Sequence, residues 1–270
     1  MDKPAQLIAK AETFYSYFRR DANAEARRLL HQAIKMDPNR AQAYAELAYA
    51  DLTAWLYNWD PAITDLGEAL AHAERAVACD EHDYYNHWIL ADVHLYRRNF
   101  DKAAQLFEVA REMAADQAIP EEQRALQVDW ADMLLLTGKT KQAVDLVEDA
   151  IAKSPVPERW FHWVLGWAYY ADGQYERSLK ALDKLGNPRN AIRKNVIANL
   201  VALKRFDEAK AHADKYIDEE GDHGIRFAAA DAMVWPALEP IEDRVPFMDG
   251  KQHSDWKSRL SKAFEKTAGK

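Results

Sequence analysis

Aromatic and acidic side chains at helical spacing are the residues of this sequence with the clearest chemical potential. Trp163, Trp167 and Tyr170 are separated by four and three residues, so a helix would place them in one stripe. Trp88 and Asp92 repeat the four-residue spacing earlier in the chain. Aromatic faces attract cations, and a nearby carboxylate adds to that attraction. The pattern therefore suits a cationic or amphipathic partner.

Two interpretations of these aromatic residues remain open from the sequence. They can form core, covering long helices or the C-terminal segment folded back on the chain. Alternatively they line a ligand groove whose carboxylates select cationic groups, since clustered tryptophan and tyrosine residues are typical binding anchors. The ligand-binding residues predicted on the second interpretation are Trp88, Asp92, Tyr96, Asp129, Asp132, Trp163, Trp167 and Tyr170.

The sequence contains none of the common catalytic or metal-binding signatures. The phosphate-loop, dinucleotide, nucleophile-elbow and H-E-x-x-H patterns do not occur. Cys79 is the only cysteine, which excludes an intrachain disulfide and a cysteine-based zinc site. His87 and His94 are seven residues apart, too far for the i, i+4 pair of a helical metal site. We therefore predict no catalytic residue, no metal site and no cofactor.

The helices that must position these residues come in pairs. The stretch from Trp160 to Lys184 predicts two short helices joined by a turn at Asp172-Gly173. Small residues fall where the two helices must approach closely. A single pair cannot bury its apolar face, so it requires copies on both sides. The spacing that defines the pair is His162-x2-Leu165-Gly166-x2-Tyr169 and then Ser178-x3-Leu182.

Five further pairs of the same design are predicted along the chain. In the first pair, Asn23 is expected to cap the second helix at its N-terminus. The second pair is stretched by an aromatic loop around Asn58–Pro61, followed by a helix at about Leu66–Ala78. Turns of the third and fourth pairs are predicted at Arg98-Asn99 and at Gly138.

The pattern ends near residue 220. Pro236, Pro240 and Pro246 exclude one long helix across the segment that follows. A last amphipathic helix at about Ser254–Lys266 is expected to cap the array. The predicted organisation is a repeat array over residues 1–220 and an irregular segment with the capping helix, packed on the array, over 221–270.

The chain resembles tetratricopeptide-repeat proteins over about Ala5–Ile217, and more narrowly the repeat modules attached to bacterial adenylate-cyclase-like signalling proteins. The narrower likeness depends on A-R-R-L-L-H-Q-A-I-K-M-D-P-N-R-A-Q-A-Y-A-E-L-A-Y-A-D-L, on W-L-Y-N-W-D-P and on R-V-P-F-M-D-G. The resemblance implies an all-α fold, a right-handed superhelix of about six helical hairpins with a C-terminal capping helix. It also implies that the first helix of each hairpin lines a concave groove, and an interaction role without catalysis.

Composition and charge limit the classes of partner. The formal net charge of −8 argues against nucleic acid, which is bound by clustered lysine and arginine. No apolar run is long enough to span a membrane, and the first residues do not resemble a signal peptide, so a cytoplasmic protein is expected. The leading hypothesis is a signalling scaffold that binds a peptide or protein segment in its groove. The alternatives are a small-molecule receptor or enzyme with an enclosed aromatic pocket, and self-association into a homodimer.

Overall fold

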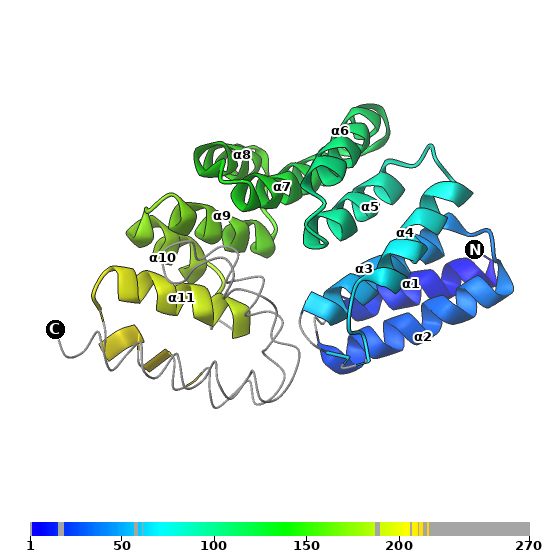
Figure 1. Cartoon of the computed structure of the whole chain (residues 1–270), viewed down its shortest axis with the longest axis horizontal. Helices are drawn as coiled ribbons and strands as arrows, with labels where there is room; N and C mark the ends of the chain where they lie inside the picture. The colour runs from blue at the N-terminus through cyan, green and yellow to red at the C-terminus, as the bar shows by residue number, and fades with distance from the viewer. Residues whose placement is uncertain are drawn as a thin grey trace. The chain divides into compact units, whose positions relative to one another are not determined.

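The computed structural model of the chain is all-helical over the residues that it describes, namely 2–15, 19–56, 59–60, 62–186, 190–205, 207–209, 211–212 and 215 (Figure 1). In this described part the helices are α1 (Lys3–Tyr15), α2 (Arg20–Met36), α3 (Ala41–Leu56), α4 (Gly67–Cys79), α5 (Tyr84–Tyr96), α6 (Phe100–Gln117), α7 (Pro120–Leu136), α8 (Thr140–Lys153), α9 (Arg159–Ala171), α10 (Tyr175–Asp183) and α11 (Asn190–Ala202).

The helices pack as consecutive hairpins. α1 packs on α2, α3 on α4, α5 on α6 and α9 on α10, and the first helices of neighbouring hairpins also touch: α1 with α3, α3 with α5, and α9 with α11. This is the predicted all-α array of helical hairpins. The chain forms two compact units, the first ending at Leu126 and the second beginning at Gln127, and each is described separately below.

Four of the turns that follow first helices share one backbone geometry. Arg98, Gly138, Gly173 and Lys204 each have a φ between 60° and 78°, in the left-handed region. At each turn the next residue donates its N–H to a carbonyl five residues earlier, which ends the helix in a Schellman-type cap. These bonds join Asn99 to His94, Lys139 to Leu134, Gln174 to Tyr169 and Arg205 to Leu200. The predicted turns at Arg98-Asn99, Gly138 and Asp172-Gly173 are confirmed.

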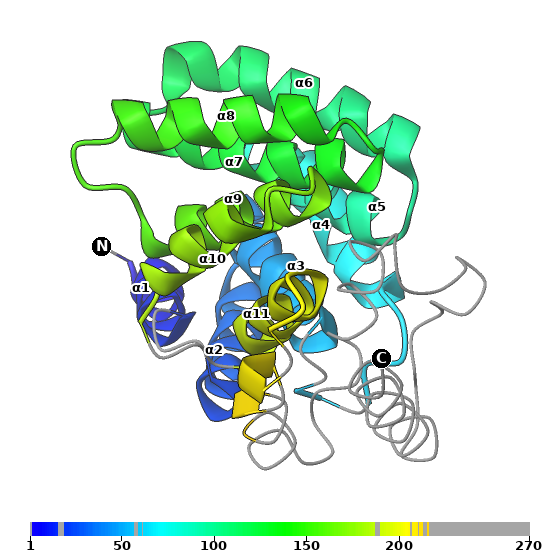
Figure 2. The same cartoon turned by 90° about the vertical axis from the view of Figure 1, so that its left-hand side faces the viewer.

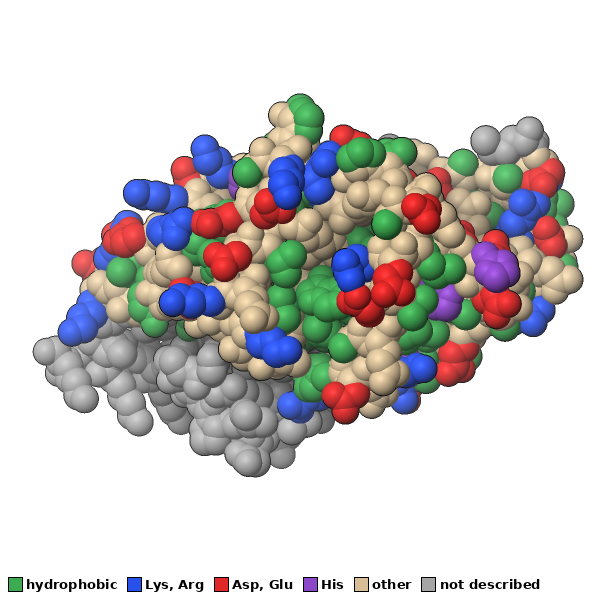
Figure 3. Space-filling view, turned by 90° about the horizontal axis from the view of Figure 1, so that it is seen from above, with side chains coloured by type: hydrophobic (Ala, Val, Ile, Leu, Met, Phe, Trp, Pro, Cys, Tyr) green, Lys and Arg blue, Asp and Glu red, His purple; other side chains and the backbone are tan. Residues whose placement is uncertain are grey.

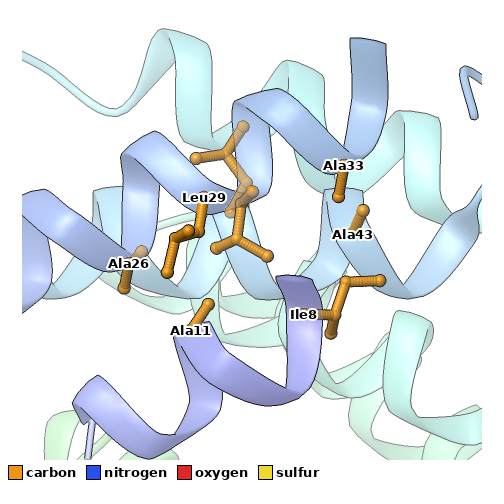
Figure 4. Close-up of a cluster of buried hydrophobic side chains, with 9 residues drawn as sticks. Ile8, Ala11, Ala26, Leu29, Ala33 and Ala43 are labelled. Carbon is orange, nitrogen blue, oxygen red and sulfur yellow. The ribbon is translucent and has the colours of Figure 1, made fainter. Parts of the chain in front are cut away.

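The core of the first unit is built largely from alanine. Ala11 of α1, Ala26 and Ala33 of α2 and Ala43 of α3 are fully buried, and Figure 4 shows them facing one another across the three helices. The alanine side chain is small, so the helix axes can approach closely. The remaining volume is filled by Ile8, Leu29, Leu30 and Leu47. The repeat spacing of small and large residues thus sets how the first hairpins stack.

The start of α2 differs from the prediction. α2 begins at Arg20, and Arg19 at its N-cap position makes no side-chain capping bond. Asn23 lies inside the helix, 4% exposed, and its Nδ2 donates to the Ala50 carbonyl at 3.0 Å. The amide therefore joins α2 to α3 instead of capping its own helix. The expectation that Asn23 is the cap was wrong because a tertiary partner satisfies its side chain.

The stretched second hairpin has a first helix, α3, of 16 residues and a set of ion pairs at its insertion. Arg27 of α2 donates from Nε to Asp51 Oδ1 at 2.7 Å and from Nη1 to Asp60 Oδ2 at 2.6 Å. His72 Nδ1 of α4 lies 3.0 Å from the other oxygen of Asp51. The Asp51 side chain is 3% exposed, so these bonds form in a largely dry environment. They join α2, α3, α4 and the inserted segment.

The second unit contains the predicted close approach at Gly166. A Cβ added at Gly166 would lie 2.5 Å from Leu182 Cδ2, so only glycine lets α9 and α10 pack at this distance. Ser178 donates to the Gly166 carbonyl at 2.6 Å, and Asn199 of α11 donates to the Ser178 hydroxyl at 2.8 Å. Figures 1 and 2 both show α9, α10 and α11 lying against one another. Polar bonds thus continue the stacking from one hairpin to the next.

The predicted capping helix at Ser254–Lys266 and the whole of 221–270 lie outside the described residues. The division into an array over 1–220 and a packed terminal segment therefore stays a prediction.

Candidate functional site

The first helices of the first unit present a row of tyrosine residues. Tyr15 of α1, Tyr49 of α3 and Tyr85 of α5 are all half-buried, and these three helices are packed side by side. The rings of Tyr15 and Tyr49 meet edge to face, with centroids 5.7 Å apart. Tyr85 meets Trp88 in the same way at 5.8 Å. Four aromatic rings from three hairpins therefore form one partly exposed surface.

A buried carboxyl group lies among these rings. Glu46 of α3 is 7% exposed, and its carboxyl group forms a hydrogen bond with the Tyr85 hydroxyl. The Tyr15 hydroxyl donates to the backbone carbonyl of Glu46 at 2.8 Å. The tyrosines of α1 and α5 thus hold α3 from both sides at this residue. We call Tyr15, Glu46, Tyr49, Tyr85 and Trp88 the aromatic–acid site.

The electrostatics of the aromatic–acid site follow from the burial of Glu46. Burial raises the pKa of Glu46 to about 8, repulsion from Glu12 adds to the rise, and the hydrogen bond with Tyr85 opposes it. Burial also raises the pKa values of Tyr15 and Tyr85 well above the usual tyrosine range, and the charge of Glu46 raises them further. The tyrosines therefore stay neutral, and Glu46 is the group that would gain from a nearby positive charge.

The predicted residues of α5 lie on one stripe that starts at this site. Trp88 contacts Tyr85, so it belongs to the aromatic–acid site. Asp92 and Tyr96 follow it at intervals of four residues along α5; Asp92 is 8% exposed and Tyr96 is half-buried. The structure thus places the three residues on one helix face, as the spacing predicted.

Glu46 is the functional candidate that sequence reasoning missed. It lies beside the packing residue Leu47, within the apolar run A-Y-A-E-L-A-Y-A at 43–50, and it is the only charged residue there. A single acid in an otherwise apolar, alanine-rich run of eight residues is the signal that could have identified it, since a buried acid needs a specific environment.

The predicted aromatic residues of the second unit contribute to its core. Trp163 and Trp167 meet edge to face at 5.5 Å, and both are half-buried. Trp163 packs against the cluster containing Leu182 and Leu200, and Trp167 packs beside Tyr170. Tyr170 is only 6% exposed, and burial raises its pKa to about 12. Part of each indole remains at the surface, so a ligand-binding role for the two tryptophans stays a prediction.

The two predicted aspartates of α7 are both half-buried. Oδ1 of Asp132 is shielded from solvent and has no hydrogen-bond partner among the described residues, and burial raises the pKa of Asp132 to about 7. Asp132 is therefore a second carboxyl group whose charge is disfavoured by its surroundings. A ligand-binding role for Asp129 and Asp132 stays a prediction.

The described part of the chain contains no group of three or more histidine, cysteine, aspartate or glutamate side chains placed to hold a metal ion. His87 and His94 instead bond locally, the first to the Glu81 carbonyl at 2.9 Å and the second to Asn99 at 3.3 Å. None of the helices in this part combines the length and apolar character that a membrane span needs. On the face drawn in Figure 3, acidic and basic side chains are interspersed with hydrophobic ones.

Residues 128–191, which cover most of α7 to α10, match the tetratricopeptide-repeat family. The Rhizobium meliloti (strain 1021) protein named "Putative adenylate cyclase 3" is 32% identical over 98 residues, which are 36% of this chain and 17% of that protein. The chain thus spans a small part of the length of this relative.

Solved structures of low sequence identity share the fold. The Pseudomonas aeruginosa pilF structure has a TM-score of 0.51 and 17% identity, covering 86% of this chain and 99% of that one. The Cut9–Hcn1 hetero-tetramer of APC/C has a TM-score of 0.59 and 16% identity, with coverages of 86% and 43%. The human IFIT1 dimer with m7Gppp-AAAA has a TM-score of 0.69 and 10% identity, with coverages of 99% and 65%.

Proposed function

We propose that this chain, whose residues 128–191 match the tetratricopeptide-repeat family, is a non-catalytic scaffold that binds a peptide or protein segment along its first helices. The observation that supports this most directly is the aromatic–acid site. Its four half-buried rings come from three successive first helices and surround a buried acid. Rigid, partly exposed aromatic residues are the side chains that most often anchor a protein partner.

The likeness to the Rhizobium protein named "Putative adenylate cyclase 3" supports an interaction role in signalling. The match covers 17% of that protein, and the proposal for this chain includes no cyclase activity. An extended segment crossing α1, α3 and α5 would meet one tyrosine from each hairpin in turn. The stripe of Trp88, Asp92 and Tyr96 would extend the contact along α5, while Asp129, Asp132, Trp163 and Trp167 would provide further contacts within the second unit.

The test is selection of linear twelve-residue peptides from a phage-displayed library against the immobilised full chain, followed by calorimetric titration of the enriched peptides. We expect Trp88→Ala to weaken binding at least tenfold, because loss of a buried aromatic anchor commonly costs about 2 kcal/mol or more. Tyr44→Ala is the matched control: Tyr44 is also half-buried on α3, but its ring lies near His72 and Arg75, away from the site.

Circular dichroism must show equal helicity for the wild-type chain and both variants. If no peptide is enriched, or if binding withstands Trp88→Ala and the double variant Trp163→Ala/Trp167→Ala alike, the scaffold proposal is wrong. Enrichment of a small molecule instead, from native lysate and by mass spectrometry, would favour the receptor alternative.

A further inference from the structure

We infer that the aromatic–acid site binds the alkylammonium group of a lysine side chain presented by the partner segment. The inference rests on the proposed function and adds the chemical class that the site selects. It depends on the juxtaposition of one buried carboxyl group with four half-buried rings, together with the absence of a cation paired with that carboxyl in the described structure.

The first step concerns charge. Among the described residues, the charged group that acts on Glu46 from α1 is Glu12, another acid, and the groups from α1 and α5 that adjoin it are the neutral phenols of Tyr15 and Tyr85. Among the residues that the structure describes, the hydrogen-bond partner of the Glu12 carboxyl group is the neutral amide of Gln42, at 3.0 Å. The site thus holds acids and phenols, and a positive charge would complement it.

Two cations of the neighbouring helices are paired with another acid. Arg27 of α2 and His72 of α4 bond to Asp51, five residues after Glu46 on α3 and therefore on a different side of that helix. Neither compensates Glu46. On the α2 and α4 sides of α3, Asp51 is paired with two cations, whereas among the described residues no cation is paired with Glu46 on the side toward α1 and α5.

The second step concerns the shape of the cation. The edge-to-face pairs Tyr15–Tyr49 and Tyr85–Trp88 present rings at different angles, which suits a compact group approached from several sides. The Tyr85 hydroxyl already uses part of the hydrogen-bonding capacity of the Glu46 carboxyl group. A planar guanidinium bonds best to both carboxylate oxygens, whereas an ammonium needs only one, so lysine fits better than arginine.

The experiment is a titration of the 15N-labelled full chain with small blocked amino acids, followed at the indole N–H signal of Trp88, which Trp88→Phe assigns. N-acetyl-lysine methylamide and its trimethylammonium derivative should give saturable shifts in the millimolar range. N-acetyl-norleucine methylamide, which has the same chain without the charge, should bind at least fivefold more weakly, and N-acetyl-arginine methylamide should fall between them.

Two variants distinguish binding at this site from a general attraction of cations to an acidic protein. Glu46→Gln keeps the shape and removes the charge, and we expect it to weaken lysine binding at least fivefold. Glu25→Gln removes one acid from α2, where Glu25 pairs with Arg28, and should change nothing. Equal binding of the norleucine and lysine derivatives, or no effect of Glu46→Gln, would overturn the inference.

The pH dependence of binding is a further test, because a purely structural role of Glu46 would not produce one. Glu46 must ionise to hold the cation, and its pKa of about 8 means that the ionised fraction rises about tenfold between pH 7 and pH 9. Affinity for the trimethylammonium derivative, whose charge is fixed, should rise about tenfold over this range and should stay flat in Glu46→Gln. A flat profile in the wild-type chain would contradict the role given to Glu46.

Two outcomes separate this inference from the scaffold proposal. Selected peptides that depend on Trp88 but contain no lysine would leave the scaffold proposal standing and overturn the inference. Butylammonium that binds as tightly as the blocked lysine would show that the site takes free amines, and would overturn a peptide lysine as the ligand.

Discussion

At the scale of single residues, Glu46 combines a structural cost with a functional capacity. The residue is 7% exposed, its carboxyl group lies beside phenol rings, and burial is the main cause of its raised pKa. A residue that serves packing alone would be apolar, since an uncompensated buried acid destabilises the folded state. Glu46 instead places a carboxyl group beside a partly exposed surface. This arrangement is expected when a ligand supplies the compensating positive charge.

The raised pKa of Glu46 predicts a pH-dependent stability. The folded chain keeps the Glu46 proton up to about pH 8, whereas the unfolded chain releases it near pH 4.5, so this residue lowers stability progressively as the pH rises between those values. Glu46→Gln should therefore be more stable than wild type at pH 8.5, by about 2 kcal/mol or more, and nearly equal to it at pH 4.5.

Urea denaturation of both chains, followed by far-ultraviolet circular dichroism at pH 4.5, 6.5 and 8.5, measures this difference. Comparing the two chains at each pH cancels every titration that they share. A stability difference that does not change with pH, or one that grows as the pH falls, would show that the pKa of Glu46 is not raised in the folded chain.

At the scale of elements, the inserted segment of the second hairpin is held by ion pairs. Arg27, Asp51, Asp60 and His72 connect α2, α3 and α4 to the residues between α3 and α4. The hydrogen bond to Arg27 is the main cause of the lowered pKa of Asp60. Lengthening a hairpin removes regular packing partners, and this network provides other contacts at that point.

Removal of the central acid of this network should be costly. Asp51→Ala leaves the partly buried Arg27 without its more deeply buried partner, and breaking a buried ion pair on one side typically destabilises by about 3–5 kcal/mol. Glu25→Ala is the control, because it breaks the exposed Glu25–Arg28 pair of the same helix α2 and should cost less than about 1 kcal/mol.

Chemical denaturation at pH 7 measures both free energies of unfolding. A cost below 1 kcal/mol for Asp51→Ala would show that the network is not required for the hairpin. Native-state hydrogen exchange then locates the effect: α2, α3 and α4 should lose protection before α9 and α10.

At the scale of the whole molecule, net charge and exposed aromatic surface act in opposite directions. The chain has a formal net charge of −8 at pH 7 and an isoelectric point near 5.6. Repulsion between copies is therefore expected at neutral pH and vanishes near the isoelectric point, where apolar contacts can bring copies together.

Sedimentation velocity as a function of protein concentration should separate the two sources of self-association. We expect a monomer at pH 7.5 in 20 mM salt and concentration-dependent association at pH 5.6. A homodimer at pH 7.5 that persists in 0.3 M salt and disappears with Trp88→Ala would instead show a specific contact between copies through the aromatic–acid site. It would also make a second copy the partner in place of a peptide.

Much of this protein follows from the sequence alone. The period of small and large residues, with Gly166 opposite Leu182 and turns at Arg98, Gly138 and Gly173, determines the hairpins because helix spacing and turn geometry are local. The helical stripe of Trp88, Asp92 and Tyr96 followed for the same reason.

Tertiary structure decided what the local pattern left open. Asn23 was predicted to cap its own helix, but its side chain bonds to the carbonyl of Ala50 on another helix. Tyr170 lies in the core because α11 packs over it. Glu46 has a raised pKa because it is buried beside Tyr15 and Tyr85, which are 31 residues before it and 39 after it in the chain. Burial and pKa depend on which helices become neighbours, and the spacing within one helix does not contain that information.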